Sequence, residues 1–112
     1  MRSQKLLEAR KKILEILKDV AEELEATVYL FGSYARGDHI VDSDIDVVII
    51  SRTFENMKFI DRVEFVRRML PQELGFDIIP LTPYELKKKL NNAFYKDISR
   101  YWIEIRPDKT RR

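Results

Sequence analysis

The sequence predicts one small domain of the α/β or α+β class, in which helices pack against a single mixed sheet. Charged and apolar residues alternate at helical spacing over residues 6–24 and 59–70. Short apolar runs with the length of strands occupy residues 27–31, 45–50 and 76–81. The 112 residues suffice to bury one hydrophobic core but leave no room for a separate substrate domain.

The first half of the chain is predicted as helix, strand, loop and strand. Over Leu6–Leu24, apolar side chains recur every three or four residues and charged residues fill the other face, as in an amphipathic helix. Thr27–Phe31 is β-branched and aromatic and stops at Gly32, which predicts a short buried strand. Residues 32–43 are expected to form a loop with room for one helical turn. Ile45–Ile50 is apolar enough to be covered on both faces except at its start.

The second half begins with another helix and strand. The helix is predicted from an apolar face that recurs at helical spacing: Phe59, Ile60, Val63, Val66 and Leu70. Pro71 ends this pattern, and Gly75 leads into the strand at residues 76–81. Proline cannot donate a backbone hydrogen bond, so Pro80 indicates the end of the strand or the edge of the sheet.

Two helical segments and a last strand complete the chain. Thr82-Pro83-Tyr84-Glu85 is a capping box with proline at the first helical position, which predicts a short helix through Leu90. Residues 91–100 are expected to form another short helical piece. Residues 101–105 alternate as a half-buried strand does, and the polar residues from Pro107 onward are expected to fray.

The composition excludes several classes of protein and site. The 21 Lys and Arg nearly balance the 19 Asp and Glu, which excludes a strongly basic nucleic-acid coat. Without cysteine there is no disulfide framework, thiol nucleophile or cysteine zinc site. The single His39 cannot build a histidine metal centre, and as a lone loop histidine it is expected to be solvated rather than a general base. Hard-metal carboxylate chemistry remains open.

The sequence also bears on location and on contact with nucleic acid. No apolar stretch reaches the roughly 20 residues that cross a bilayer, and the start of the chain leads into a charged segment. We therefore expect a cytoplasmic protein without membrane contact. Lys87–Lys89 and the terminal Arg111 and Arg112 are expected to be solubility features, so nucleic acid is not the expected partner.

Several carboxylates lie at the N-terminal end of the second predicted strand. Asp44 and Asp46 stand two residues apart, which places both on one face with their Cα atoms roughly 6.5 Å apart. Such a pair repels, and Mg²⁺, which prefers oxygen ligands, removes that penalty. Asp77 lies at the start of another strand and would join the pair if the two strands were neighbours, giving three acids for a two-metal site. The alternative is that Asp44 and Asp46 merely end a strand in solvent.

A second pattern lies upstream, directly after the first strand. Gly32 would let the backbone approach a phosphate closely, and Ser33 adds a hydroxyl donor. By itself, Gly-Ser after a strand is most often only a turn. Arg36 could hold phosphate or could pair with Asp38 or Asp42, and the ion pair is favoured.

Together these motifs resemble a known family. Gly32-Ser33, ten residues and then Asp44-Ile45-Asp46 is similar to the pattern of the nucleotidyltransferase superfamily related to DNA polymerase β. The fuller form, with Ala35, Gly37 and Ser43, resembles the minimal nucleotidyltransferases found as the small partner in two-gene toxin–antitoxin pairs. Asp77 matches the position of the third acid in that family. The resemblance covers roughly residues 27–90 and implies a bare polymerase-type palm.

The resemblance also implies an activity. Such proteins transfer a nucleoside monophosphate, typically AMP from ATP, to an acceptor hydroxyl and release pyrophosphate. Asp44, Asp46 and Asp77 would be the catalytic and metal-binding residues for two Mg²⁺ ions, and Gly32, Ser33 and Arg36 would bind the nucleotide. The acceptor is often a tyrosine on a helical ribonuclease toxin of the higher-eukaryote-and-prokaryote nucleotide-binding (HEPN) type. The chain would then act as the antitoxin.

The domain division and the alternatives follow from this assignment. Residues 1–112 are expected to be one domain, with an N-terminal helix at 1–26, a catalytic core at 27–105 and a flexible basic tail at 106–112. One alternative function is a non-catalytic antitoxin that covers its toxin; another is transfer to a small molecule or an RNA end. Most aromatic side chains are expected in the core, with three candidates for an exposed patch that could bind a partner or a second copy: Phe94, Tyr95 and Trp102.

Overall fold

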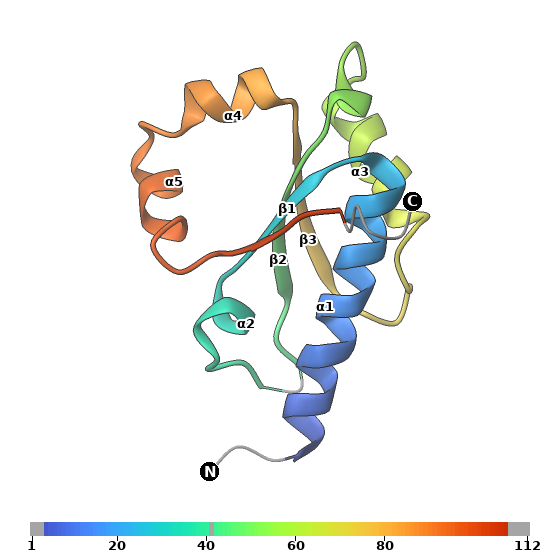
Figure 1. The fold of residues 1–112 in the computed structure, drawn as a ribbon, viewed down its shortest axis with the longest axis vertical. Helices are drawn as coiled ribbons and strands as arrows, with labels where there is room; N and C mark the ends of the chain where they lie inside the picture. The colour runs from blue at the N-terminus through green and yellow to red at the C-terminus, as the bar shows by residue number, and fades with distance from the viewer. Residues whose placement is uncertain (1–3, 41, 108–112) are drawn as a thin grey trace.

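A four-stranded sheet with helices on both faces forms the centre of the computed structural model, which describes residues 4–40 and 42–107 (Figure 1). The elements in chain order are α1 (Gln4–Leu24), β1 (Thr27–Phe31), α2 (Ser33–Arg36), β2 (Ile45–Ile50), the 3₁₀ turn η1 (Arg52–Phe54), α3 (Phe59–Arg67), β3 (Phe76–Leu81), α4 (Pro83–Lys89), α5 (Ala93–Ile98) and β4 (Ile103–Ile105). This architecture confirms the predicted fold class.

The sheet is mixed and has the strand order β3-β2-β1-β4. β1 pairs antiparallel with β2 and with β4, whereas β2 and β3 are parallel. β3 is therefore an edge strand, which is where Pro80 was expected, since a residue without a backbone N–H is tolerated at an edge. The neighbouring position of β2 and β3, on which the proposed role of Asp77 depended, is confirmed.

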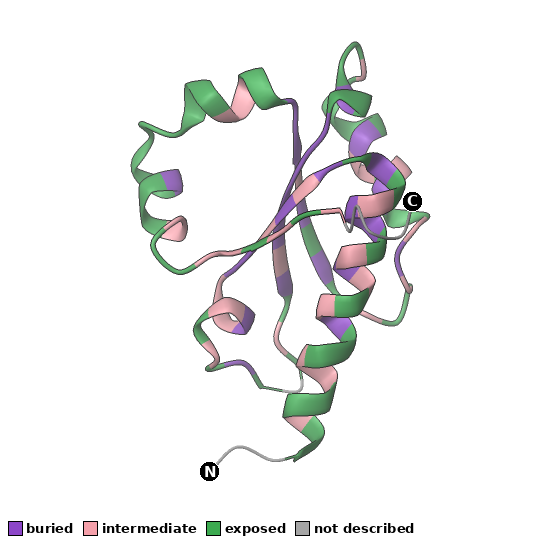
Figure 2. Cartoon of the chain, in the orientation of Figure 1, coloured by how far each residue is buried: buried purple, intermediate pink, exposed green. Residues whose placement is uncertain are grey.

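Two apolar clusters hold the layers together. The buried positions of the chain are purple in Figure 2. One face of the sheet packs on α1 and α3 through side chains such as Leu17, Val47 and Val66, each with no exposed surface. The other face packs on the C-terminal helices through Val48, Leu81 and Tyr95 and others. Because successive strand residues point to opposite faces, β2 supplies both clusters, as its nearly continuous apolar run predicted.

The buried face of α3 differs from the prediction. Phe59 is 53% exposed and Ile60 is 65% exposed, which the prediction did not expect. The helix buries Val66, as predicted, and also Arg62, which was not predicted. Arg62 can occupy a buried position of the helix because its guanidinium group is hydrogen-bonded. Its Nε donates to the Met57 carbonyl at 3.0 Å, and its Nη1 donates to the Pro80 carbonyl at 3.2 Å. Such pairing is what makes a buried cation tolerable.

The C-terminal segment also departs from the prediction. The last strand covers only Ile103–Ile105, since Tyr101 is exposed and Trp102 stacks on Tyr29 with ring centroids 3.9 Å apart. The suggested three-residue aromatic patch is not formed, because Tyr95 is buried and Trp102 is half-buried. Of those three, only Phe94 is substantially exposed. Of the expected tail at 106–112, residues 108–112 lie outside the described part of the chain.

In the described ranges, no helix combines the length and the hydropathy that a transmembrane span requires.

Candidate active site

Three cross-strand neighbours form a row at one end of the sheet. Phe31 of β1 is paired with Asp46 of β2, and Asp46 is paired with Asp77 of β3. Paired residues point to the same face of a sheet, so the two carboxylates lie on the face that packs against α5. Asp44 precedes β2 by one residue and is exposed, whereas Asp46 is half-buried. The structure therefore brings all three predicted acids to one end of the sheet.

Both carboxylates of the acid pair lie against glycines. A Cβ on Gly32 would overlap Asp46 Oδ2 and lie 3.2 Å from Asp46 Cγ. Gly32 also has φ 72° and ψ −152°, a backbone conformation that is essentially restricted to glycine. A Cβ on Gly75 would lie 3.2 Å from Asp44 Oδ1. The sequence motifs do not mark Gly75 as a site residue; the one available signal is its position directly before the acid-bearing strand β3.

Mutual repulsion and partial burial act on Asp46. Desolvation raises the pKa of its carboxyl, the charges of Asp77 and Asp44 raise it further, and Arg36 lowers it. Oxygen donors that repel one another fit a hard divalent cation, which would relieve that repulsion. Within residues 4–40 and 42–107, however, no three acidic or histidine side chains form a ready-made metal-binding group. The three acids thus lie at the same end of the sheet, but in the described residues they do not form a complete ligand set.

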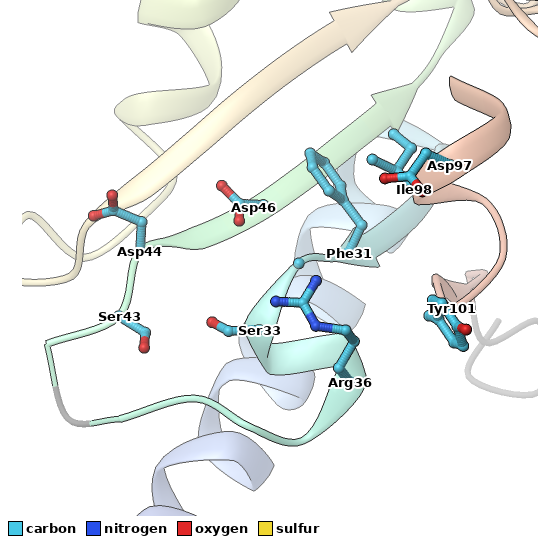
Figure 3. A pocket seen from close by; sticks show the side chains of 10 residues that line it. Phe31, Ser33, Arg36, Ser43, Asp44, Asp46, Asp97, Ile98 and Tyr101 are labelled. Atoms are coloured by element: carbon cyan, nitrogen blue, oxygen red, sulfur yellow. The ribbon is translucent and has the colours of Figure 1, made fainter. Parts of the chain in front are cut away.

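A cavity of about 580 Å³ opens beside this acid pair (Figure 3). Its lining comes from β1, α2, the start of β2 and the α5 region: Phe31, Gly32, Ser33, Arg36, Ser43, Asp44, Asp46, Asp97, Ile98 and Tyr101. Ser33 and the Arg36 guanidinium lie on one side, and Asp97, Ile98 and Tyr101 lie on the opposite side (Figure 3). The volume is typical of small-molecule sites.

Sequence reasoning found one side of this cavity and missed the other. Gly32, Ser33 and Arg36 all line it, as do Asp44 and Asp46. Arg36 also forms the expected ion pair with Asp38, with Nε 3.2 Å from Oδ2, and both side chains are exposed. The wall made by Asp97, Ile98 and Tyr101 lies more than fifty positions away in sequence and carries no motif, so no local signal pointed to it.

The short helix α2 is held in place by contacts with α1 and with His39. Arg10 Nε of α1 donates to the Tyr34 carbonyl at 3.1 Å. The Tyr34 ring stacks on His39 with centroids 4.2 Å apart and an interplanar angle of 17°. His39 is only 1% exposed, and its Nε2 lies 3.3 Å from the Leu6 carbonyl oxygen. The expectation of a solvated histidine is therefore wrong, because this ring fills the space between α1 and α2.

A second cavity, of about 470 Å³, adjoins the first on the side of β3. It is lined by Phe31, Asp46, Asp77, Ile78, Ile79 and Phe94. Phe31 and Asp46 belong to both cavities, whereas Asp77 lines only the second of these two. The Asp46 carboxylate thus lies at the junction of the two cavities.

Comparison with known proteins identifies the family. The nucleotidyltransferase domain family matches residues 10–107. The chain belongs to the nucleotidyltransferase domain family. A relative from Methanocaldococcus jannaschii, named "Putative protein adenylyltransferase MJ0141", is 33% identical over 98 residues, which cover 88% of this chain and 92% of that protein. The chain is thus a nucleotidyltransferase enzyme.

Solved structures share the fold of this nucleotidyltransferase. A crystal structure of "a putative nucleotidyltransferase from Sulfolobus solfataricus" aligns with a TM-score of 0.60 and 29% identity, covering 78% of this chain and 82% of that one. A toxin–antitoxin structure with AMP-PNP aligns with a TM-score of 0.55 and 20% identity over 91% of this chain and 76% of that one. A mutant of the toxin–antitoxin pair MntA-HpeT gives a TM-score of 0.52 and 17% identity over 91% and 75%.

Proposed function

We propose that this nucleotidyltransferase transfers AMP from ATP to an acceptor hydroxyl in a Mg²⁺-dependent reaction. The observation that carries the proposal is the cavity in which Gly32, Ser33 and Arg36 face Asp44 and Asp46. Hydroxyl and guanidinium donors suit a triphosphate, and carboxylates suit the metal that accompanies it. The choice of ATP is supported by the name of the M. jannaschii relative and by AMP-PNP in a structural neighbour.

Each group has a role in this proposal. Ser33 and Arg36 bind phosphate oxygens, and Gly32 lets the backbone approach the acids without a clash. Asp44, Asp46 and Asp77 would hold two Mg²⁺ ions, which supply charge neutralisation at the phosphates and activate the acceptor hydroxyl. Ile98 and Tyr101 form an apolar and aromatic wall against which the nucleoside packs. Positioning and electrostatic stabilisation then provide most of the rate acceleration.

We further propose that the acceptor is a tyrosine of a HEPN-type helical toxin and that the reaction silences that toxin in the cytoplasm. The support is the fold shared with two toxin–antitoxin structures and the adenylyltransferase name of the relative. In this proposal, the partner protein supplies the remaining walls of the acceptor site. The alternative is a non-catalytic antitoxin, but the intact acids and glycine-serine turn favour catalysis.

The test combines the purified chain, ATP labelled at the α-phosphate, Mg²⁺ and the helical protein encoded by the adjacent gene. We expect a mass gain of one AMP or more on the partner, and loss of that gain with EDTA. The matched control is the Asp44→Asn/Asp46→Asn chain, which should bind the partner without modifying it. Neutralisation of the toxin without any covalent change would contradict the catalytic proposal and support occlusion.

A further inference from the structure

Asp97 is a carboxylate of the first cavity to which the proposed contacts with phosphate and metal give no role. Its side chain lines the cavity from α5, on the wall opposite Ser33 and Arg36 (Figure 3). Across residues 4–40 and 42–107, no arginine, lysine or histidine forms an ion pair with it. Asp97 is also exposed, so its carboxylate can accept hydrogen bonds from a ligand in the cavity.

The local structure of α5 does not account for a negative charge at residue 97. The residue lies in the last turn of the helix, which ends at Ile98. An anionic side chain is unfavourable near a helix C-terminus, and Lys96 is the residue of this turn with the favourable charge. Arg100 follows three positions later but forms no ion pair with Asp97 in the described part of the chain. Replacing this carboxylate by a neutral side chain should therefore not destabilise α5.

The groups that line the first cavity are ordered from one end to the other (Figure 3). The proposed metal ligands Asp44 and Asp46 lie at one end, together with the Ser33 hydroxyl. Asp97 and Tyr101 lie at the other end. A triphosphate belongs at the end with the metal ligands, because the Asp97 carboxylate would repel its negative charges. In this orientation, the nucleoside half of the nucleotide lies at the α5 end.

We infer that Asp97 binds the ribose of the nucleotide, through hydrogen bonds from its 2′ and 3′ hydroxyls, and so selects ribonucleotides over deoxyribonucleotides. The inference rests on the proposed function, since it concerns the nucleotide of the same reaction. A carboxylate only accepts hydrogen bonds, and its two oxygens match two neighbouring hydroxyl donors. Hydrogen bonds to a charged group are stronger than those between neutral groups, so the loss of one hydroxyl should lower the affinity measurably.

The bases supply the other donors that a carboxylate could accept from, but they favour a different nucleotide. Guanine presents two adjacent donors, N1–H and the N2 amino group, which would pair with both carboxylate oxygens. Adenine presents its N6 amino group beside the N1 acceptor, whose lone pair a carboxylate oxygen would repel. For the ATP of the proposed function, the ribose is therefore the better partner of Asp97.

The neighbours of Asp97 on the same wall suit the base. Ile98 is half-buried, and Tyr101 is 62% exposed, so its ring has surface that a purine can cover. Stacking on an aromatic ring is possible for every base, since each has a π-face. The wall thus combines two side chains that pack against a base without distinguishing it and one carboxylate that recognises the sugar.

The experiment measures Kd values by calorimetry for three Mg²⁺-bound nucleotides and the full chain. They are the α,β-methylene analogues of ATP, 2′-deoxy-ATP and GTP, in which the bond that breaks during transfer is replaced. We expect the wild type to bind the ATP analogue about tenfold more tightly than the deoxy analogue. In Asp97→Ala, this ratio should fall to about two or less, and the Kd for the ATP analogue should rise about tenfold. Asp97→Asn, which keeps an acceptor oxygen without the charge, should give an intermediate ratio.

Lys96→Ala is the matched control. Lys96 precedes Asp97 on α5, is exposed and does not line the first cavity. The variant should therefore keep the wild-type ratio between the ATP analogue and the deoxy analogue.

Three results would overturn the inference. If Asp97 acted only as a charge, Asp97→Ala would bind all three nucleotides more tightly, because a charge that repels phosphate would be gone. Equal binding of the ATP and deoxy analogues by the wild type, or an unchanged ratio in Asp97→Ala, would exclude a contact with the ribose. A wild-type preference for the GTP analogue that disappears in Asp97→Ala would assign the carboxylate to the base. A wild-type chain that binds none of the three nucleotides would instead overturn the proposed function.

Discussion

The Asp46 carboxylate lies directly against the Cα of Gly32, with no room between them for a methyl group. This contact joins the turn after β1 to the acid of β2, which are antiparallel neighbours. The glycine therefore serves two needs at one position, a backbone with φ 72° and a close approach to a charged side chain. Any side chain at residue 32 would move the acid that we propose as a metal ligand.

Gly32→Ala should accordingly impair both folding and catalysis. The substitution adds an unfavourable backbone conformation, which costs about 1–3 kcal/mol of unfolding free energy, and displaces Asp46. We expect at least a hundredfold loss of AMP transfer together with a lower melting temperature. Gly37→Ala is the control, because Gly37 also has positive φ, 87°, but a Cβ there meets no atom within 4 Å. It should lose only about 1–2 kcal/mol of stability and keep its activity. Equal activity losses in the two variants would refute the steric argument.

Asn at positions 44 and 46 should separate activity from stability. Asp46 has a raised pKa, so its charged form is disfavoured in the folded state, chiefly by desolvation and by the charges of Asp77 and Asp44. The protonated Asp46 carboxyl therefore contributes most to the free energy of unfolding below its unfolded-state pKa. This contribution is lost as the pH rises through the raised folded-state pKa. In EDTA at neutral pH, Asp46→Asn should therefore be at least as stable as the wild type in urea titration. AMP transfer by Asp44→Asn/Asp46→Asn should fall below detection, and transfer at the wild-type rate would refute the carboxylate assignment.

Ser33→Ala should mainly weaken nucleotide binding. Hydrogen bonds to charged groups contribute about 1.5–3 kcal/mol, so we expect a Kd for Mg²⁺–AMP-PNP raised by roughly tenfold to a hundredfold in calorimetry. The fold should be unchanged, because the Ser33 side chain lines a cavity. Ser99→Ala is the matched control: its hydroxyl donates to the Lys96 carbonyl at 3.1 Å, and it does not line this cavity. Unaltered affinity in Ser33→Ala would leave Ser33 as a turn residue only.

Arg36 can be tested against its ion-pair partner. If Arg36 binds phosphate, Arg36→Gln should raise the KM for ATP about tenfold or more, since a charge-assisted hydrogen bond is lost. Asp38→Asn removes only the exposed ion pair, whose contribution to stability is at most about 1 kcal/mol, and should leave the KM for ATP unchanged or lower. Steady-state kinetics with ATP decide between the two roles. A similar rise in KM for both variants would show that the ion pair itself matters.

Arg62 and Glu85 should couple the stability of the chain to acid pH. Arg62 Nη1 and Nη2 donate to Glu85 Oε1 and Oε2 at 2.6 and 3.3 Å, and the hydrogen bond from Arg62 is the main cause of a lowered Glu85 pKa. A lowered pKa means that the stabilisation is present above the unfolded-state value near 4.5 and is lost as the pH falls through the folded-state value. Glu85→Gln should cost about 1.5–3 kcal/mol at pH 7, and this cost should shrink as the pH falls below 4.5 and through the lowered folded-state pKa of Glu85.

The control for the Glu85→Gln experiment is Glu104→Gln. Glu104 also has a lowered pKa, because Arg106 Nε donates to it at 2.8 Å, but both partners are exposed. Exposed pairs contribute little, so this variant should change the stability by less than about 1 kcal/mol. Urea titrations across pH distinguish the two. A pH-independent loss in Glu85→Gln would show that the carboxamide fails for a steric rather than an electrostatic reason.

Sequence reasoning performed best where the signal is local. The capping box at Thr82 and Glu85 is present, with Glu85 N donating to Thr82 Oγ1 at 3.2 Å, because both groups lie within one helical turn. It failed at Arg62, whose burial depends on the carbonyl of Pro80, eighteen positions away. It failed again at His39, which is 1% exposed and whose Nε2 lies 3.3 Å from the carbonyl oxygen of Leu6, thirty-three positions away. In each failure, the deciding partner lies outside the local window that periodicity describes.

The amino-acid sequence by itself determined the strands, the helices, the glycine-serine turn and the three acids, since periodicity, capping and motif spacing are properties of near neighbours. Only the tertiary structure decided that Asp77 stands opposite Asp46, that residues of the α5 region line the first cavity, and that Phe94 lines the second. The physical reason is that these relationships depend on strand register and on which helix packs over which face. Both are set by long-range burial of apolar surface rather than by the spacing of residues along the chain.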